Sequence, residues 1–528
     1  MNAEKKKVWI CRIARFLAGC LFAPIFLLSI FAFPLGTFAK QKEPQMTKTK
    51  TMGQIFTPQY LVSDILDEAG YTITNNILEK HVIDNSCGDG AFLEEILRRY
   101  CNAYLSVHKN KKHLSAQLST YIHGIELDES AYKTCLKRLS AIAADFGLTG
   151  INWDIRNEDT LSVKDFDGKM DFVLGNPPYV RIHNLQGKTR QVKSFDFSTG
   201  GMTDLYLVFY EIGLRMLTDT GVLCYIAPSS WINSLAGHNM REYLRKSGGL
   251  RSFVDLGHFQ PFKATAYTAI VTLTSGGAQN FSYKLYEGPN KIKFVEALRY
   301  DDVFFADALY LGTSREIYNF RKIKTSNTLN YVKVKNGFAT LADDVFIADE
   351  FPFDKYVIRV IKASTGKWRK GFFPYDTNGK PLPSKKIFAD RKITSYLEKH
   401  KELLLKGMSQ KEQEDWYLYG RTQALKDVWK DKYAINTVIK DITSIKLNHV
   451  KAGEGVYSGL YVLANVDYAT LKKVLMSDSF IEYIKVLKKY KSGGYYTYNS
   501  KDLEQYLNYK LGEYFLQKSQ MYKTTNDK

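Results

Sequence analysis

The chain has 528 residues and a formal net charge of +19 at pH 7, which is long enough for two or three domains with their own cores. An apolar fraction of 45% is ordinary for a globular protein and excludes general disorder. The charge is uneven, because residues 321–528 hold about 38 lysines and arginines against about 23 acids, whereas residues 51–320 come to about −3. This pattern indicates a polyanion-binding module joined to a different domain.

The cysteines give no sign of a cross-linked or zinc-bound scaffold. They stand at positions 11, 20, 87, 101, 135 and 224, with no Cys-x-x-Cys pair and no regular spacing. Such a pattern argues against a disulfide framework or a zinc site and is typical of a protein in a reducing cytosol.

The first forty-five residues resemble a targeting segment. Residues 1–15 carry five lysines and arginines, and residues 16–39 carry no charge, as in a signal peptide or a membrane-spanning helix. Met46 and Met52 lie shortly before the first recognisable motif. We therefore expect the physiological chain to start at one of these methionines and to be cytoplasmic, with a genuine membrane anchor as the alternative.

The first predicted helix follows residues 53–58. Thr57 is a good N-cap and Pro58 a good first helical residue, ahead of an apolar-periodic stretch. The free N–H groups at such a helix start could hold a carboxylate, although the same pattern is also that of an ordinary helix start.

Residues 81–84 predict a strand, and residues 85–90 a turn before a helix that begins at Ala91. Gly88 and Gly90 would let this turn pass close beneath a ligand, because they have no Cβ atom. Taken alone, two glycines after a strand are a weak signal.

Three more strands follow with the same alternation of strand, loop and helix. They are predicted at residues 121–126, 151–155 and 170–174, and this order indicates an α/β fold with a doubly wound, mostly parallel sheet. The second strand ends in Glu126, where nucleotide-binding folds contact ribose hydroxyls. The third is followed by Asp159, which is placed to accept a hydrogen bond from an adenine amino group.

The fourth strand runs into Gly175 and then Asn176-Pro177-Pro178-Tyr179. Two prolines fix φ and remove two N–H donors, so this loop is stiff and its carbonyls point outward. A stiff loop with an amide, a free carbonyl and an aromatic ring is suited to a flat, amine-bearing group. The alternative is that the prolines only end the strand.

These motifs, in this order, resemble a type II N6-adenine DNA methyltransferase of the gamma motif order, as found in restriction–modification systems. The resemblance rests on Thr57-Pro58, Asp84 with Cys87-Gly88-x-Gly90, Glu126, Asp159 and Asn176-Pro177-Pro178-Tyr179, and it continues through Asp204-Leu205-Tyr206 and Phe262. It covers roughly residues 50–280, and the C-terminal part more loosely. One departure is Asn85-Ser86, where the family usually has Pro-Ala.

The resemblance implies S-adenosylmethionine as cofactor and no metal. The residues implied to bind the cofactor are Thr57, Asp84, Cys87, Gly88, Gly90, Glu126, Asp159 and Pro178. The Asn176 side-chain oxygen and the Pro177 carbonyl would accept from the target amino group, next to Pro178. Tyr179 and Phe262 would stack on an adenine flipped out of the duplex. The alternative for Phe262 is a core aromatic at a strand edge.

The resemblance also divides the chain. Residues 1–45 form an extension, residues 46–290 the catalytic domain, residues 291–330 a connector and residues 331–520 an α+β target-recognition domain. The expected partners are double-stranded DNA and a separate cognate restriction endonuclease, and the expected state is a monomer. Methylation of a protein glutamine amide or of RNA stays open as an alternative, as does a non-catalytic DNA-binding subunit.

Overall fold

The computed structural model describes residues 57–108, 110–185, 189–262, 266–406 and 412–526. The N-terminal extension and the expected starts at Met46 and Met52 lie outside these residues. Over the described ranges, no helix has both the length and the apolar character that a membrane crossing requires.

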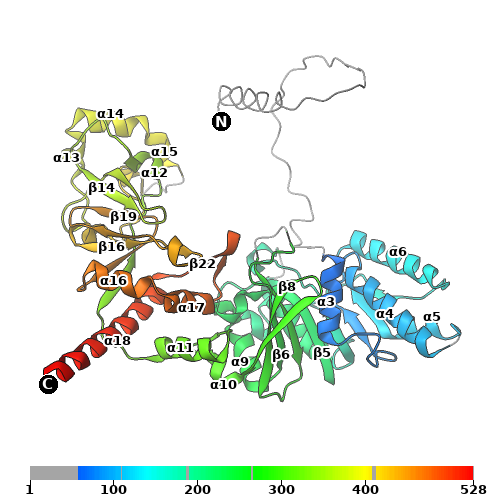
Figure 1. Cartoon of the computed structure of the whole chain (residues 1–528). Helices are drawn as coiled ribbons and strands as arrows, with labels where there is room; N and C mark the ends of the chain where they lie inside the picture. Colours follow the sequence, from blue (N-terminus) through cyan, green and yellow to red (C-terminus); the bar gives the residue numbers. More distant parts are fainter. Residues whose placement is uncertain (1–56, 109, 186–188, 263–265, 407–411, 527–528) are drawn as a thin grey trace, which may run out of the picture. The chain divides into compact units, whose positions relative to one another are not determined.

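Within the described residues, nine strands form one central sheet (Figure 1). In their order across the sheet they are β3 (Asp154–Arg156), β2 (Ile122–Ile125), β1 (Val82–Asp84), β4 (Met170–Gly175), β5 (Leu217–Pro228), β7 (Thr268–Thr274), β6 (Leu250–Asp255), β8 (Asn280–Gly288) and β9 (Lys291–Arg299). The pairings β3·β2, β2·β1, β1·β4, β4·β5 and β6·β8 are parallel, and β7 is antiparallel to both of its neighbours. The predicted doubly wound, mostly parallel α/β fold is confirmed.

Alternate residues of the inner strands enter two separate cores, one on each face of the sheet. Val82 packs into one core and Ile83 into the other, and Leu174 and Val173 divide in the same way. One face is covered by α3 (Gln59–Ala69), α4 (Ala91–Val107), α5 (Leu114–Tyr121) and α6 (Glu129–Asp145), and the other by α8 (Leu205–Met216) and α9 (His238–Ser247). Burial on both faces explains why these strands read as apolar runs.

The start of α3 differs by one residue from the expectation. The helix begins at Gln59, and Pro58 is its N-cap with ψ at 144°, without a side-chain cap. A residue before proline is disfavoured in the helical region, and Thr57 lies outside the helix. Its hydroxyl group has another partner, which is described below.

The sheet continues beyond the catalytic boundary expected at residue 290. Strands β8 and β9 form an antiparallel hairpin on the sheet edge, so residue 290 falls in the hairpin turn. The connecting elements after Arg299 are α10 (Tyr300–Val303), β10 (Phe304–Phe305), β11 (Ala308–Leu309) and α11 (Ser314–Thr325).

The C-terminal part combines small sheets with helices. Its strands are β12 (Val332–Asn336), β13 (Ile347–Ala348), β14 (Val357–Lys362), β15 (Lys367–Phe372), β16 (Lys432–Ile435), β17 (Val438–Ile439), β18 (Leu447–Val450), β19 (Gly455–Tyr457), β20 (Leu460–Ala464), β21 (Tyr490–Lys491) and β22 (Tyr495–Thr497). Its helices are α12 (Asp343–Phe346), α13 (Ser384–Phe388), α14 (Arg391–Lys399), α15 (Lys401–Leu405), α16 (Tyr468–Leu475), α17 (Asp478–Val486) and α18 (Ser500–Asn526). The Phe320 ring on α11 stacks on Tyr483 of α17, with centroids 4.9 Å apart.

Gly175 ends β4 in a place where a side chain does not fit. An added Cβ would lie 2.6 Å from Asp84 Oδ1, and the backbone has a φ of +157°. We predict that Gly175→Ala lowers the free energy of unfolding by about 1–3 kcal/mol, measured by urea denaturation. The control is Gly168→Ala, where φ is +70° but an added Cβ meets nothing within 4 Å. An equal loss in both variants would contradict the role of the Asp84 contact.

Candidate active site

The predicted site residues come from strands whose carboxyl ends meet at one edge of the sheet. Strand β1 ends at Asp84, β2 is followed by Glu126, and β4 is followed by Asn176. Because β1 pairs in parallel with both β2 and β4, the three loops share the edge where open α/β sheets bind their ligands.

One hydrogen bond joins the first motif to the Asn-Pro-Pro-Tyr loop. The Asn176 amide nitrogen donates to the Thr57 hydroxyl oxygen over 3.1 Å, although 119 residues separate the two. Pro177 is buried, while Pro178 is only partly covered. The bond fixes how the Asn176 amide is oriented at the end of β4.

Tyr179 lies beside Phe262, the second aromatic residue that the resemblance implies for the site. The two rings meet edge to face with centroids 6.4 Å apart, and the Tyr179 hydroxyl donates to the carbonyl of Ile226 in β5 over 3.2 Å. Phe262 is 8% exposed and also packs into the core on the α3 face. The core and the site interpretations of Phe262 are therefore compatible, and its role in stacking stays a prediction.

The glycine-rich turn is held by the strand next to it. Cys87 donates its N–H to the Ile125 carbonyl over 3.0 Å, and Gly88 donates to Glu126 Oε2 over 2.8 Å. An added Cβ at Gly90 would lie 2.9 Å from the Cys135 sulfur of α6, whereas one at Gly88 would meet nothing within 4 Å. Gly90 thus permits close packing, and Gly88 faces open space.

The Cys87 thiol is buried beside Cys135. A hydrogen bond with the Cys135 thiol, together with burial, raises the pKa of Cys87 well above its ordinary value. Of the cysteines in the described part of the chain, all four are free of disulfides. A neutral thiol is a packing group here rather than a nucleophile.

Glu126 has little freedom, because two backbone groups hold its carboxylate. It is 7% exposed, and besides Gly88 it accepts from the Asp128 N–H at Oε1 over 2.7 Å. The Asn157 side chain donates to the Glu126 carbonyl over 2.8 Å. This carboxylate is positioned before any ligand arrives.

Asp84 is the most deeply buried acid of the site, at 1% exposed. Burial raises the pKa of Asp84 to about 7; the hydrogen bond from the Ser86 N–H opposes this shift, and the charge of Glu126 adds to it. A carboxyl group that titrates near neutral pH responds strongly to a nearby cation.

Asp159 lies in the loop after β3 and is partly exposed. Its Oδ1 accepts from the Leu161 N–H over 3.1 Å. The neighbouring Thr160 hydroxyl donates to the Asn85 carbonyl over 2.6 Å, so the loops after β1 and β3 are joined.

Asn85, which departs from the family pattern, has a structural role that the sequence did not reveal. It is fully buried, and its Oδ1 accepts from the Tyr225 hydroxyl of β5 over 2.8 Å. The side chain thereby links the loop after β1 to β5. The only signal in the sequence was a polar residue where proline is usual.

A cavity of about 560 Å³ lies away from this site, near the start of β1 and β4. Its lining residues are His81, His123, Arg156, Asp165, Phe166, Lys169 and Met170. The His81 and His123 rings are hydrogen-bonded over 2.9 Å, and His123 contacts Asp154 over 2.7 Å. Among the described residues, no group of three or more metal-ligating side chains is found.

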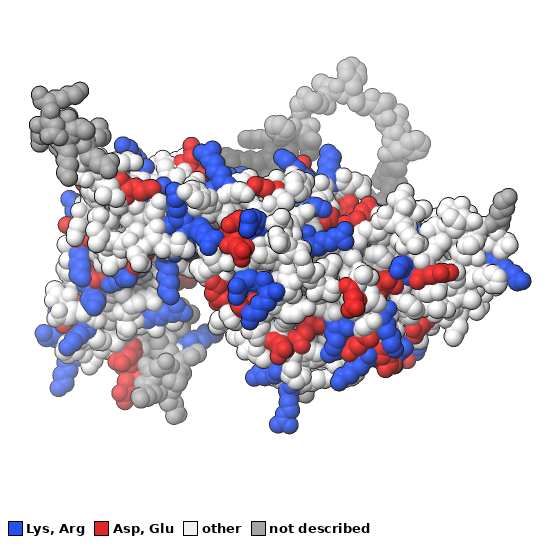
Figure 2. All heavy atoms as spheres, turned by 90° about the horizontal axis from the view of Figure 1, so that it is seen from below, with Lys and Arg blue, Asp and Glu red and all other residues white. Residues whose placement is uncertain are grey.

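Much of the positive charge of the C-terminal part is used internally. Lys335 and Lys430 pair with Asp427, while Lys432 is buried and donates to backbone carbonyls. Burial lowers the pKa of Lys432 to about 8. Figure 2 shows lysines and arginines interspersed with acids on the face in view. Net charge alone therefore overstates the basic surface.

Comparisons with known proteins confirm the resemblance to methyltransferases of restriction–modification systems. Residues 95–262 match the family described as Eco57I restriction-modification methylase. Type II methyltransferase M.BstVI of Geobacillus stearothermophilus is 26% identical over 340 residues, which are 56% of this chain and 60% of that protein. Type II methyltransferase M.PaeR7I of Pseudomonas aeruginosa is 28% identical over 247 residues, which are 44% of this chain and 42% of that protein.

A solved structure of the Type IIL restriction-modification enzyme MmeI in complex with DNA has the same fold. It matches with a TM-score of 0.56 and 15% identity, over 84% of this chain and 63% of that one. In sequence, the matched part of this chain corresponds to about half the length of the two methyltransferases named above.

The buried Asp84 carboxyl predicts a pH-dependent stability. Its folded pKa of about 7 lies above the ordinary 3.8, so its contribution is complete below about pH 4 and is lost as the pH rises through about 7. We predict that this loss is absent from Asp84→Asn, which should be more stable than the original chain at about pH 8. Urea denaturation at several pH values measures the free energy of unfolding of both proteins. An identical pH dependence in the two would contradict the raised pKa of Asp84.

Proposed function

We propose that this chain is a DNA methyltransferase that transfers a methyl group from S-adenosylmethionine to N6 of adenine in double-stranded DNA, as the modification arm of a restriction–modification system. The observation that carries the proposal is the Asn176-Pro177-Pro178-Tyr179 loop at the carboxyl end of β4, oriented by Thr57. The matches to restriction–modification methylases support it.

The residues around Gly88 fit S-adenosylmethionine, which would supply an activated methyl group. Asp84 would bind the ammonium group of the cofactor, and Glu126 would accept hydrogen bonds from its ribose hydroxyls. Asp159 would accept a hydrogen bond from its adenine. Gly88 borders open space, so its backbone can approach a ligand closely. Thr57, Cys87, Gly90 and Pro178 complete the proposed cofactor contacts.

The target amine requires acceptors and a stacking surface. The Asn176 side-chain oxygen and the Pro177 carbonyl would accept its two hydrogens, which draws the nitrogen lone pair out of conjugation with the ring. Tyr179 and Phe262 would stack on the flipped base. Alignment against the methyl group then supplies most of the rate acceleration.

Duplex DNA is favoured over the other amide- or amine-bearing substrates. The excess of lysine and arginine in residues 321–528 suits a negatively charged polymer such as DNA. A glutamine side chain of a protein is neutral, so it gives no reason for this positive charge. RNA is the closer alternative. We assign target recognition to residues 331–520. We further propose that the enzyme is monomeric and cytoplasmic, and that a separate chain carries the cognate endonuclease activity.

We predict that Asn176→Ala loses turnover by at least about 100-fold and keeps its affinity for S-adenosylmethionine, because the amide serves the target. Transfer of labelled methyl to unmethylated DNA, RNA and protein in parallel measures turnover, and calorimetry measures cofactor binding. The matched control is Asn102→Ala, at an exposed position of α4. Methylation of cytosine by the original chain, or methylation of protein alone, would contradict the proposed function.

A second variant tests the cofactor side. Asp84→Asn should weaken S-adenosylmethionine binding and remove its pH dependence, since a cation favours the ionised carboxylate and affinity should rise as the pH passes about 7. Calorimetry in two buffers of different ionisation enthalpy shows the proton release. The exposed Asp219→Asn is the control, and unchanged binding in Asp84→Asn would place the ammonium group elsewhere.

A further inference from the structure

A short hairpin near the end of the chain is fixed to the catalytic sheet. It consists of β21 and β22 with the turn Ser492-Gly493-Gly494 between them, and we refer to residues 490–497 as the GG hairpin. Gly493 and Gly494 have φ values of 76° and 83°, which other residues rarely adopt. Strand β22 also pairs with β17, so the hairpin is part of a small sheet.

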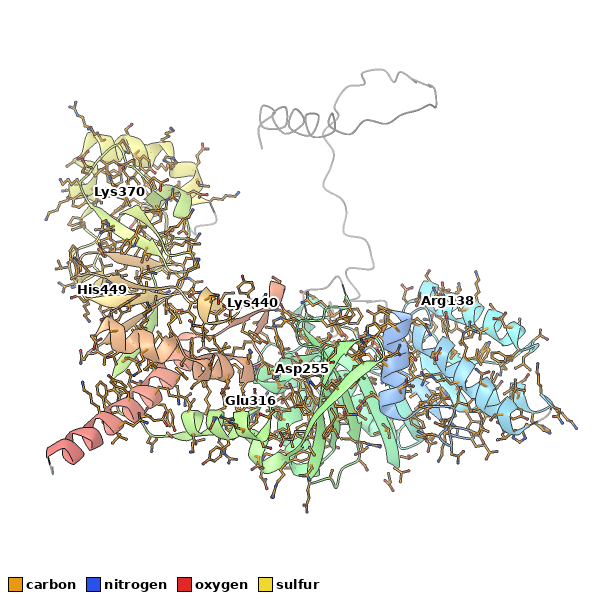
Figure 3. The ribbon with its side chains drawn as sticks, in the orientation of Figure 1. Arg138, Asp255, Glu316, Lys370, Lys440 and His449 are labelled. Atoms are coloured by element: carbon orange, nitrogen blue, oxygen red, sulfur yellow. The ribbon has the colours of Figure 1, made fainter. Side chains whose placement is uncertain are left out.

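A buried carboxylate anchors the base of the GG hairpin. Asp255, the last residue of β6, is 3% exposed and accepts from the Tyr490 hydroxyl over 2.6 Å. Lys488 forms an ion pair with the same carboxylate over 3.2 Å and donates to the Tyr283 hydroxyl over 2.7 Å. Figure 3 labels Asp255 on the sheet. Such a fully paired buried charge holds its partners in place.

Aromatic rings extend this anchor. The His258 ring lies 4.9 Å from the rings of both Tyr490 and Tyr496, and the Tyr267 ring lies 5.4 Å from Tyr490. Phe262, which contacts Tyr179, lies on the same segment between β6 and β7.

The anchor lies at the edge of the sheet that carries the candidate active site. Strand β6 runs parallel to β5 and β4, because β7 is antiparallel to both β5 and β6. The carboxyl end of β6, at Asp255, is therefore at the same edge as Gly175. The GG hairpin is therefore anchored at the sheet edge whose loops are proposed to receive cofactor and target.

The tip of the GG hairpin is exposed and positively charged. Tyr495 is 38% exposed, and Lys491 and Lys440 are exposed as well. The Lys440 side chain borders the turn, since an added Cβ at Gly494 would lie 3.4 Å from its Cε. Figure 3 labels Lys440.

These two lysines differ from their neighbours. Lys488 pairs with Asp255 and Lys489 with Asp502, whereas within the described ranges neither Lys440 nor Lys491 has an ion-pair partner. Unpaired cations beside an exposed ring and a glycine turn form the composition that contacts phosphates and unstacked bases.

We propose that the GG hairpin contacts DNA at the active-site edge, with Tyr495 stacking on a base and Lys440 and Lys491 binding the flanking phosphates. The inference rests on the proposed function for the identity of its partner. It adds an aromatic contact with DNA that lies outside the Asn176 loop. The hairpin that carries this contact is held in place by the buried contacts of Tyr490 and Lys488 with Asp255.

The test uses the full chain and short DNA duplexes selected by binding from a randomised pool. Tyr495→Ala should weaken duplex binding about tenfold, and Tyr495→Phe should restore it, because stacking needs only the ring. Lys440→Ala and Lys491→Ala should each lower the slope of log Kd against log salt by about 0.9. Fluorescence anisotropy measures all four.

Two controls separate DNA contact from folding. Tyr318→Ala on α11 removes an exposed ring, and Lys112→Ala removes an exposed cation outside the C-terminal part; both should bind DNA as the original chain does. Cofactor affinity and thermal unfolding should stay unchanged in the hairpin variants. Unchanged DNA binding in Tyr495→Ala, or an equal loss in Tyr318→Ala, would overturn the inference.

The readouts also distinguish the two proposals. A wild-type chain that binds the selected duplexes without methylating adenine would overturn the proposed function, and the binding of the hairpin variants would still decide the inference. A wild-type chain that selects no duplex would overturn the hairpin inference.

Discussion

The hydrogen bond between the Asn176 amide and the Thr57 hydroxyl ties the start of the described chain to the end of the central strand β4. Around it, Asp84 and Glu126 lie at the ends of the adjacent strands, already held by backbone N–H groups. Such prior positioning matters for the proposed methyl transfer, which depends on alignment more than on acid–base chemistry. The sheet supplies the alignment because its parallel strands end at one edge.

Most of the fold was predictable, because its signals are local. Apolar runs that end in an acid or a glycine marked β1, β2 and β4, and several residues that the resemblance implies for the site lie where these strands end. The differences are also local: the start of α3 lies past Pro58, and the central sheet continues beyond residue 290 as a hairpin. Sequence patterns locate elements better than they locate boundaries.

Long-range polar contacts had no such signal. Asp255 and Tyr490 are 235 residues apart, and neither stands in a motif. Asn85 looked like a small departure, yet its amide reaches Tyr225 in the middle of the sheet. Periodicity reports which face of an element is apolar, but it does not tell which buried polar groups pair across the fold. These pairings need the structure.

The shared anchor at Asp255 limits which residues near the end of the chain can be replaced. A segment exchange that ends before Lys488 would leave the anchor intact. One that replaced Lys488 and Tyr490 with unrelated residues would leave a buried carboxylate without its partners, which is strongly destabilising. A replaced C-terminal segment would therefore have to keep the contacts of Lys488 and Tyr490 with Asp255.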